Sequence, residues 1–222
     1  MNKVFIFLAA IILISSCTAT RYVEPLEKNK QAVGFNFGGA LIEYSGLTIP
    51  IPLTAVSYAR GLSDNLTVFG SLHLTSMYYK NFQTDLGVTY KLLEQNKYIP
   101  ALSVTPSVNF IKHKGEGNSN LWPSIDLNGY WNYGKKNHYF YAGIMNWFEL
   151  SKTRAHNEPS LRRVVWNPQV GHVFKLGTFQ LATELKFLAP YEKTDFIFIP
   201  YKGIFGSNGA TGVFINLSKT FL

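Results

Sequence analysis

The sequence ends in Gly212-Val-Phe-Ile-Asn-Leu-Ser-Lys-Thr-Phe-Leu222, a stretch that alternates two kinds of side chain. One parity carries Val213, Ile215, Leu217 and Phe221, and the other carries Gly212, Asn216, Ser218 and Thr220. Successive side chains of a β-strand point to opposite faces. The stretch therefore predicts a strand with one apolar face and one small, polar face.

This strand resembles the closing strand of bacterial outer-membrane β-barrels, which is apolar towards lipid and polar towards the lumen. That family usually ends on an aromatic residue, whereas here Phe221 is followed by Leu222. The alternative for this strand alone is an edge strand of a soluble β-sandwich.

Nine further segments alternate in the same way, and none has the period of an amphipathic helix. They cover residues 33–41, 53–62, 66–75, 82–92, 102–110, 121–132, 138–150, 164–176 and 179–187. The segment at 82–92 alternates most regularly. The segment at 138–150 is apolar on both faces, so its orientation stays open.

The connections between these segments alternate in length. Tight turns are expected at residues 62–65, 94–97, 134–137 and 177–178, and longer loops at 43–52, 112–120, 151–163 and 189–210, with 77–81 as a short exception. Membrane barrels have short periplasmic turns and longer outer loops. We therefore predict an all-β fold: a transmembrane, antiparallel, up-and-down β-barrel of about ten strands over residues 31–222. The alternative is a soluble sandwich or lipocalin-like barrel, whose apolar parity would face inward.

The N-terminus has the layout of an export signal. A basic start, Met1-Asn2-Lys3, precedes an apolar run at residues 4–14, which is shorter than the roughly 20 residues of a membrane-spanning helix. The ending Ile14-Ser-Ser-Cys17 resembles a lipobox, and this resemblance implies acylation of Cys17, the only cysteine. We expect a lipoprotein signal peptide at residues 1–16 and a periplasmic linker at 17–30. A plain signal peptide with an incidental cysteine is the alternative.

The resemblance extends to lipoproteins of the Bacteroidetes type, in which acidic residues just after the cysteine are associated with surface export. Thr18-Ala-Thr-Arg21 contains none. The expected location is therefore the outer membrane, with the lipid anchor of Cys17 on the periplasmic side.

Composition agrees with export to a membrane. Charged residues make up 15% of the chain and aromatic residues 15%, whereas soluble domains carry about 25% charged residues. The net charge of +8 could indicate nucleic acid in a cytosolic protein. In an exported chain the expected anionic partner is phosphorylated lipid, so nucleic acid is excluded.

Five charged residues lie on the polar parity of their strands and are expected inside the barrel. They are Asp85, Lys91, Asp126, Glu184 and Lys186. A Lys or Arg facing lipid near the bilayer centre costs about 2 to 4 kcal/mol. We therefore predict an ion-pair network that fills the lumen, which is narrow in barrels of this size. A proton or solute relay through the same charges is the alternative.

Basic residues gather in the connections predicted on the outer side. The rim comprises Lys152, Arg154, Arg162, Arg163, Lys193 and Lys202. Arg and Lys bind phosphate and carboxylate groups. The rim could bind lipopolysaccharide or an acidic partner, or it could only keep the loops soluble.

The outer loops also hold acidic residues and histidines, as in barrels that resemble omptin proteases and lipid A deacylases. They include Glu43, His113, Glu149, His156, Glu158, Glu192 and Asp195, in no context that matches a motif of those families. We therefore expect a non-catalytic barrel lipoprotein without a cofactor. A lipid anchor is redundant for a membrane-spanning protein, which favours an accessory or structural subunit of a larger outer-membrane protein complex. A surface enzyme and a narrow transporter are the alternatives.

Overall fold

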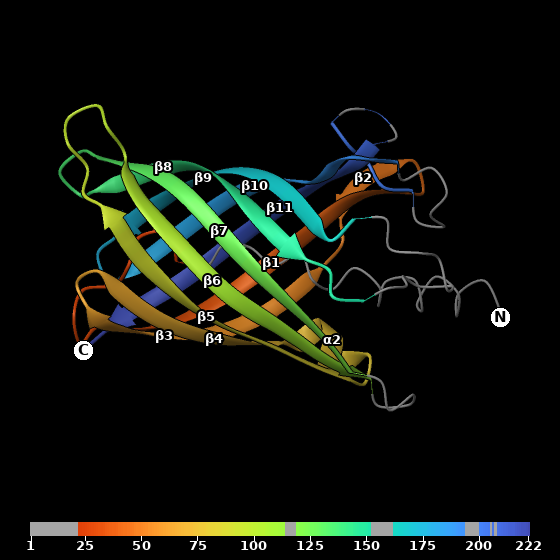
Figure 1. The fold of residues 1–222 in the computed structure, drawn as a ribbon, viewed down its shortest axis with the longest axis horizontal. Coiled ribbons are helices and arrows are strands. Elements are labelled where there is room, and N and C mark those ends of the chain that lie inside the picture. Colours follow the sequence, from red (N-terminus) through yellow and green to blue (C-terminus); the bar gives the residue numbers. More distant parts are fainter. Residues whose placement is uncertain (1–21, 114–118, 152–161, 194–199, 205, 207) are drawn as a thin grey trace.

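The computed structural model describes residues 22–113, 119–151, 162–193, 200–204, 206 and 208–222, which form a closed barrel of tilted strands (Figure 1). The elements are β1 (Gln31–Tyr44), β2 (Leu47–Pro50), β3 (Leu53–Ser63), β4 (Leu66–His73), α2 (Leu74–Tyr78), β5 (Asn81–Leu93), β6 (Ala101–His113), β7 (Ser119–Tyr133), β8 (His138–Phe148), β9 (Val164–Leu176), β10 (Phe179–Lys193) and β11 (Asn208–Phe221).

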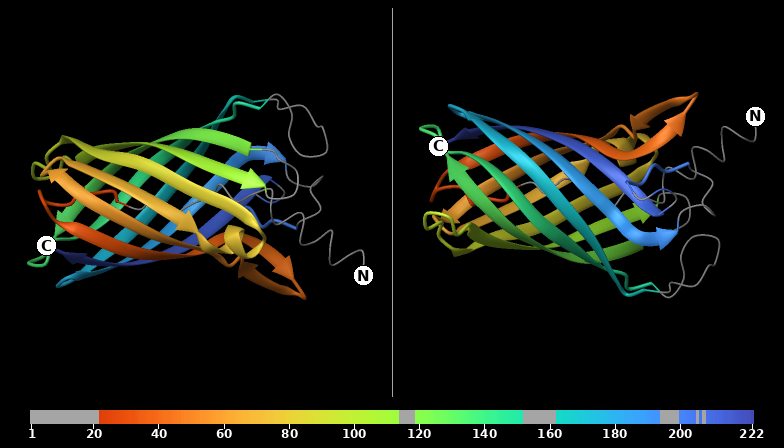
Figure 2. Two further views of the ribbon diagram at one scale, coloured as in Figure 1. Left: turned by 90° about the horizontal axis from the view of Figure 1, so that it is seen from below. Right: turned by 90° about the horizontal axis from the view of Figure 1, so that it is seen from above.

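The last strand closes the barrel onto the first. β11 pairs antiparallel with β1 from Gln31 opposite Phe221 to Ala40 opposite Gly212. β2 pairs with the far end of β1 and forms a hairpin that projects beyond the wall (Figure 2). The wall therefore has ten strands, β1 and β3 to β11, and the predicted antiparallel barrel is confirmed.

Apolar side chains face outward on all ten strands of the wall. One exposed example from each strand, in chain order, is Phe35, Tyr58, Leu72, Leu86, Val108, Leu127, Phe140, Val170, Leu185 and Leu217. In β11, Asn216 and Ser218 are buried on the opposite face, as predicted. An apolar exterior around a polar interior contradicts the soluble alternative, in which the apolar parity would face inward.

The orientation of β8 is set by its neighbours. Tyr139, Tyr141, Met145 and Trp147 are buried, while Phe140 is exposed. Both faces of this strand are apolar, so alternation cannot orient it. Pairing of Tyr139 with Val173 of β9, which is itself buried, puts the tyrosines inside.

One helical turn was not predicted. α2 occupies the connection between β4 and β5, and five residues are too few to show a helical period. Within the described residues, no helix is long and apolar enough to cross a membrane.

The two ends of the barrel differ. The connections β3–β4, β5–β6, β7–β8 and β9–β10, the start of β1 and the end of β11 lie at one end, which we call the turn end. The β1–β2 hairpin, α2, the ends of β6, β8 and β10 and the starts of β7, β9 and β11 lie at the other, which we call the loop end (Figure 2).

Candidate functional site

Residues 22–30, which we call the plug segment, occupy the turn end of the barrel, with residues 22–26 inside the lumen and Glu27, Lys28 and Asn29 exposed at its mouth. Tyr22 and Leu26 are buried against Ala32, Ala59 and Phe69 of the wall. The sequence predicted a linker at residues 17–30, and the described part of it, residues 22–30, packs against the turn end of the barrel. The physical reason is that its apolar side chains lose contact with water there. Residues 1–21, including Cys17, lie outside the described residues.

On one wall, the plug segment bonds to β3, β4 and β5. The amide of Asn29 donates to the carbonyl of Gly61 at 2.9 Å. The amide of Leu26 donates to Thr67 Oγ1 at 2.7 Å, and Thr89 Oγ1 donates to the carbonyl of Tyr22 at 2.8 Å. These bonds fix the backbone of the segment and satisfy polar groups that would otherwise be buried without partners.

On the opposite wall, the plug segment contacts β7 and β9. The carboxylate of Glu24 accepts hydrogen bonds from Lys175 Nζ and, at 3.4 Å, from Asn132 Nδ2. β4 and β9 are five steps apart in a ring of ten strands. The segment therefore crosses the lumen from wall to wall.

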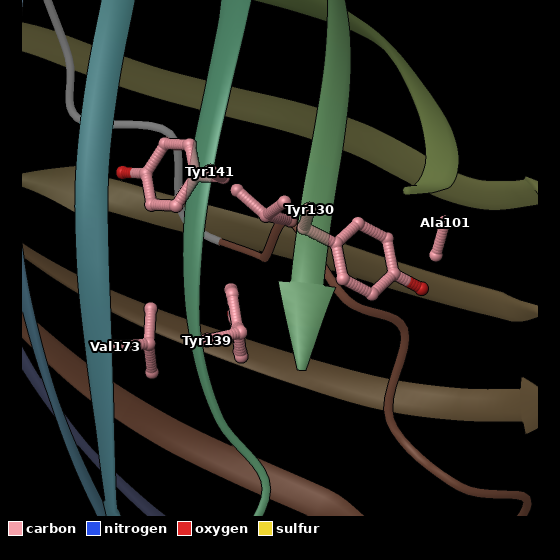
Figure 3. Close-up of a cluster of buried hydrophobic side chains, with 6 residues drawn as sticks. Ala101, Tyr130, Tyr139, Tyr141 and Val173 are labelled. Carbon is pink, nitrogen blue, oxygen red and sulfur yellow. The ribbon is translucent and has the colours of Figure 1, made fainter. Parts of the chain in front are cut away.

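Val23 packs into a cluster of aromatic side chains at this level. The other buried members of the cluster are Tyr130, Tyr139, Tyr141, Ala101 and Val173 (Figure 3). The rings of Tyr130 and Tyr139 lie 5.6 Å apart, tilted by 56°. The cluster gives the lumen an apolar side at the turn end, which a water-filled channel would not have.

Beyond the plug segment lies an ion pair formed by two of the predicted lumen residues. Lys186 Nζ lies 3.4 Å from Glu184 Oε1, and Tyr141 donates to Glu184 Oε2 at 2.8 Å. Lys186 is 0% exposed. Burial of a charge is costly unless it is paired and hydrogen-bonded, so this pair depends on both partners.

Asp85 is hydrogen-bonded to two neighbours on β4. Ser71 Oγ donates to Asp85 Oδ2 at 2.5 Å, and His73 Nε2 lies 2.8 Å from the same oxygen. All three residues are buried. In a Ser-His-Asp triad the histidine lies between the other two, whereas here the aspartate does. The cluster therefore lacks the contact that would activate Ser71 as a nucleophile.

The two remaining predicted lumen residues, Lys91 and Asp126, lie on β5 and β7. Lys91 Nζ pairs with Glu94 at 2.6 Å near the turn end. Asp126 is buried on β7, in register with Thr105 and Met145. Met145 in turn contacts Lys186, with its sulfur 3.5 Å from Nζ, so Asp126 lies close to the Glu184–Lys186 pair. Asp85 and Lys91 have other partners.

The described residues of the basic rim have partners within the chain or lie at a strand end. Arg162 Nε lies 2.7 Å from Glu192 and its guanidinium 4.6 Å from the centre of the Tyr191 ring. Arg163 Nη1 donates to the carbonyls of Glu149, Leu150 and Ser151 at 3.1 to 3.3 Å. Lys193 is exposed at the end of β10. Lys152 and Arg154 lie outside the described residues.

Lys202 pairs with Glu43 on the β1 strand of the β1–β2 hairpin. The hydrogen bond from Lys202, together with its charge, lowers the pKa of the Glu43 carboxyl. The outer acidic residues Glu43 and Glu192 therefore hold basic rim residues in place. His156, Glu158 and Asp195 lie outside the described residues. Among the described residues, no group of three His, Cys, Asp or Glu could hold a metal ion.

The plug segment is the feature that sequence reasoning missed. Its signal was weak: Tyr22, Val23 and Leu26 are apolar but follow no period among charged neighbours. A second signal was Gly61, whose missing side chain leaves room for the backbone of the segment.

No family model matches the sequence, and no curated protein matches it. Among solved structures, the translocator domain of the autotransporter NalP from Neisseria meningitidis is 8% identical, with a TM-score of 0.53 over 99% of this chain and 97% of that one. An outer membrane channel from Pseudomonas putida F1 is 9% identical, with a TM-score of 0.48 over 92% and 100% of the two chains. The first likeness shows that the chain has the fold of an outer-membrane β-barrel.

Proposed function

We propose that this chain is an outer-membrane β-barrel lipoprotein with a closed lumen, which serves as a non-catalytic accessory or structural subunit of a larger outer-membrane assembly. The observation that carries this proposal is the plug segment. It crosses the lumen and bonds to both walls, while paired polar side chains such as Glu184 and Lys186 fill the space beyond it. A barrel of this size leaves little room for a solute path past them.

The exterior supports a position across a membrane. Exposed aromatic residues lie near both ends of the wall: Tyr90, Tyr133, Phe179 and Phe221 at the turn end, and Tyr44, Phe82 and Trp166 at the loop end. Such girdles mark the two interfaces of outer-membrane barrels. With short turns in the periplasm, the plug segment closes the periplasmic mouth, and acylation of Cys17 adds a second attachment to the membrane.

The accessory role follows from what the chain has beyond a simple barrel. A lipid on Cys17 is not needed for anchoring and would instead position the chain within an assembly. Among the described residues of the basic rim, Arg162, Arg163 and Lys202 already have partners within the chain. The apolar exterior and the projecting β1–β2 hairpin offer further surface for a protein partner.

Two measurements test the proposal on the full-length protein. Purification in mild detergent followed by native mass spectrometry should recover the chain together with a second outer-membrane protein. Planar-bilayer recordings of the purified chain should show no conductance. Purification of the chain without any partner protein would reject the accessory role. Steady conductance would favour the alternative that the chain is a narrow transporter.

A further inference from the structure

We infer that the turn end of the lumen is a binding site for an extended peptide in which an acidic residue is flanked by apolar residues, and that the plug segment occupies this site in cis. This inference does not depend on the accessory role.

The site recognises peptide backbone with side chains of the wall. Thr67 Oγ1 accepts the amide of Leu26, and Thr89 Oγ1 donates to the carbonyl of Tyr22. Both threonines are fully buried at 0% exposure. Such main-chain bonds form with any sequence and provide affinity, while pockets for side chains provide selectivity.

Three features of the wall select the side chains. Phe69 and the small residues Ala32 and Ala59 accommodate Tyr22 and Leu26. The tyrosines of β7 and β8 accommodate Val23. Between these apolar regions, Lys175 of β9 and Asn132 of β7 bind one carboxylate, that of Glu24. The expected ligand is therefore a peptide with the pattern of residues 22–26: two apolar residues, an acidic residue, a proline and an apolar residue.

Gly61 makes the site deep enough for a backbone. A Cβ at this position would lie 2.2 Å from the carbonyl oxygen of Glu27 and 2.7 Å from that of Leu26. Real Cβ atoms do not approach backbone so closely, so the site requires glycine here as long as a peptide fills it.

A covalently attached occupant competes strongly with any free peptide. A short tether keeps its effective concentration in the millimolar range. A free peptide therefore binds well only when the contacts of the plug segment with the wall are weakened. In the wild-type chain, the plug segment inhibits peptide binding.

The test uses the full-length chain with Val23→Asp and Leu26→Asp, which weaken the cis segment and leave the wall unchanged. The probe is a fluorescent peptide of residues 22–30 with a blocked N-terminus, followed by anisotropy in detergent. We expect saturable binding at least tenfold tighter than to the wild-type chain. Adding Gly61→Ala should abolish it, and replacing Glu24 by Gln in the peptide should weaken it severalfold.

Heat-modifiable mobility first establishes that each variant is folded. Should the aspartate variant fail to assemble, Val23→Ala with Leu26→Ala replaces it in the same assay. Absence of saturable binding to a folded variant would overturn the inference. Binding that is unaffected by both Gly61→Ala and the Gln peptide would also overturn it, because it would reflect adsorption to the micelle.

Discussion

Gly61 of β3 and Glu27 of the plug segment approach so closely that a Cβ on Gly61 would lie 2.2 Å from the Glu27 carbonyl oxygen. The amide of Asn29 also donates to the Gly61 carbonyl. The wall and the segment therefore fit each other through backbone as well as side chains. This contact makes Gly61 the most direct place to separate the plug segment from the barrel.

Gly61→Ala should displace the plug segment and leave the barrel assembled. The methyl group collides with backbone carbonyls that cannot rotate away, whereas alanine is acceptable within the strand itself. Chymotrypsin should then cut after Tyr22, which is buried in the wild-type chain, and mass spectrometry should detect a fragment that begins at Val23. The control is Gly129→Ala, where the new Cβ meets only ordinary contacts at 3.5 Å or more. Equal resistance of both variants to cleavage would contradict this prediction.

Arginine on the exterior of β5 should destabilise the barrel more at the middle of the membrane than near the interface. Leu86 lies mid-strand and is 66% exposed, while Leu92 lies near the turn end and is 50% exposed. Near the bilayer midplane an Arg facing lipid costs about 2 to 4 kcal/mol, and near the interface about 0 to 1 kcal/mol. Urea unfolding in lipid vesicles should therefore show a much larger loss of unfolding free energy for Leu86→Arg than for Leu92→Arg. Equal losses would argue against a membrane-spanning wall.

Lys186→Met should destabilise the barrel by about 3 to 5 kcal/mol, because it leaves the Glu184 carboxylate buried without its cation. Adding Glu184→Gln should recover most of that loss, since the buried charge is removed as well. The free energy of unfolding of the two variants gives the comparison. A double variant as unstable as the single one would show that Lys186 contributes through packing, not through its charge.

Cys17→Ala should block both lipid labelling and removal of residues 1–16. The cysteine thiol is the only group that the lipobox resemblance offers for acylation. Metabolic labelling with a fatty acid and mass spectrometry of the mature N-terminus provide the measurement, with Ser16→Ala as a control that keeps the thiol. An unmodified N-terminus at a residue other than Cys17 in the wild-type chain would reject the anchor.

The strands could be predicted because alternation is a local property of the sequence. Phe82, Gln83, Leu86 and Asp85 reveal the two faces of β5 without any knowledge of the rest of the chain. β8 shows where this reasoning stops, because Tyr139 and Phe140 are both aromatic and only pairing with β9 assigns one to the lumen.

The interior contacts could be predicted only in part. Asp85 and Glu184 are buried on the parity that predicted the lumen, but parity carries no information on which residues meet across neighbouring strands. Two partners of Asp85 are Ser71 and His73, and both contacts depend on the register between β4 and β5. The plug segment was missed for a related reason: its burial exists only once ten strands have closed around it.

Hydrogen exchange of residues 22–30 in the wild-type, full-length chain tests the central claim most directly. The amides of Leu26, Lys28 and Asn29 donate to Thr67, Asp64 and Gly61 of the wall. Exchange followed by mass spectrometry in detergent should show protection of peptides from this segment that approaches that of β4 and β5. Exchange at the rate of an unstructured chain, with the strands still protected, would contradict a lumen closed by its own N-terminal segment.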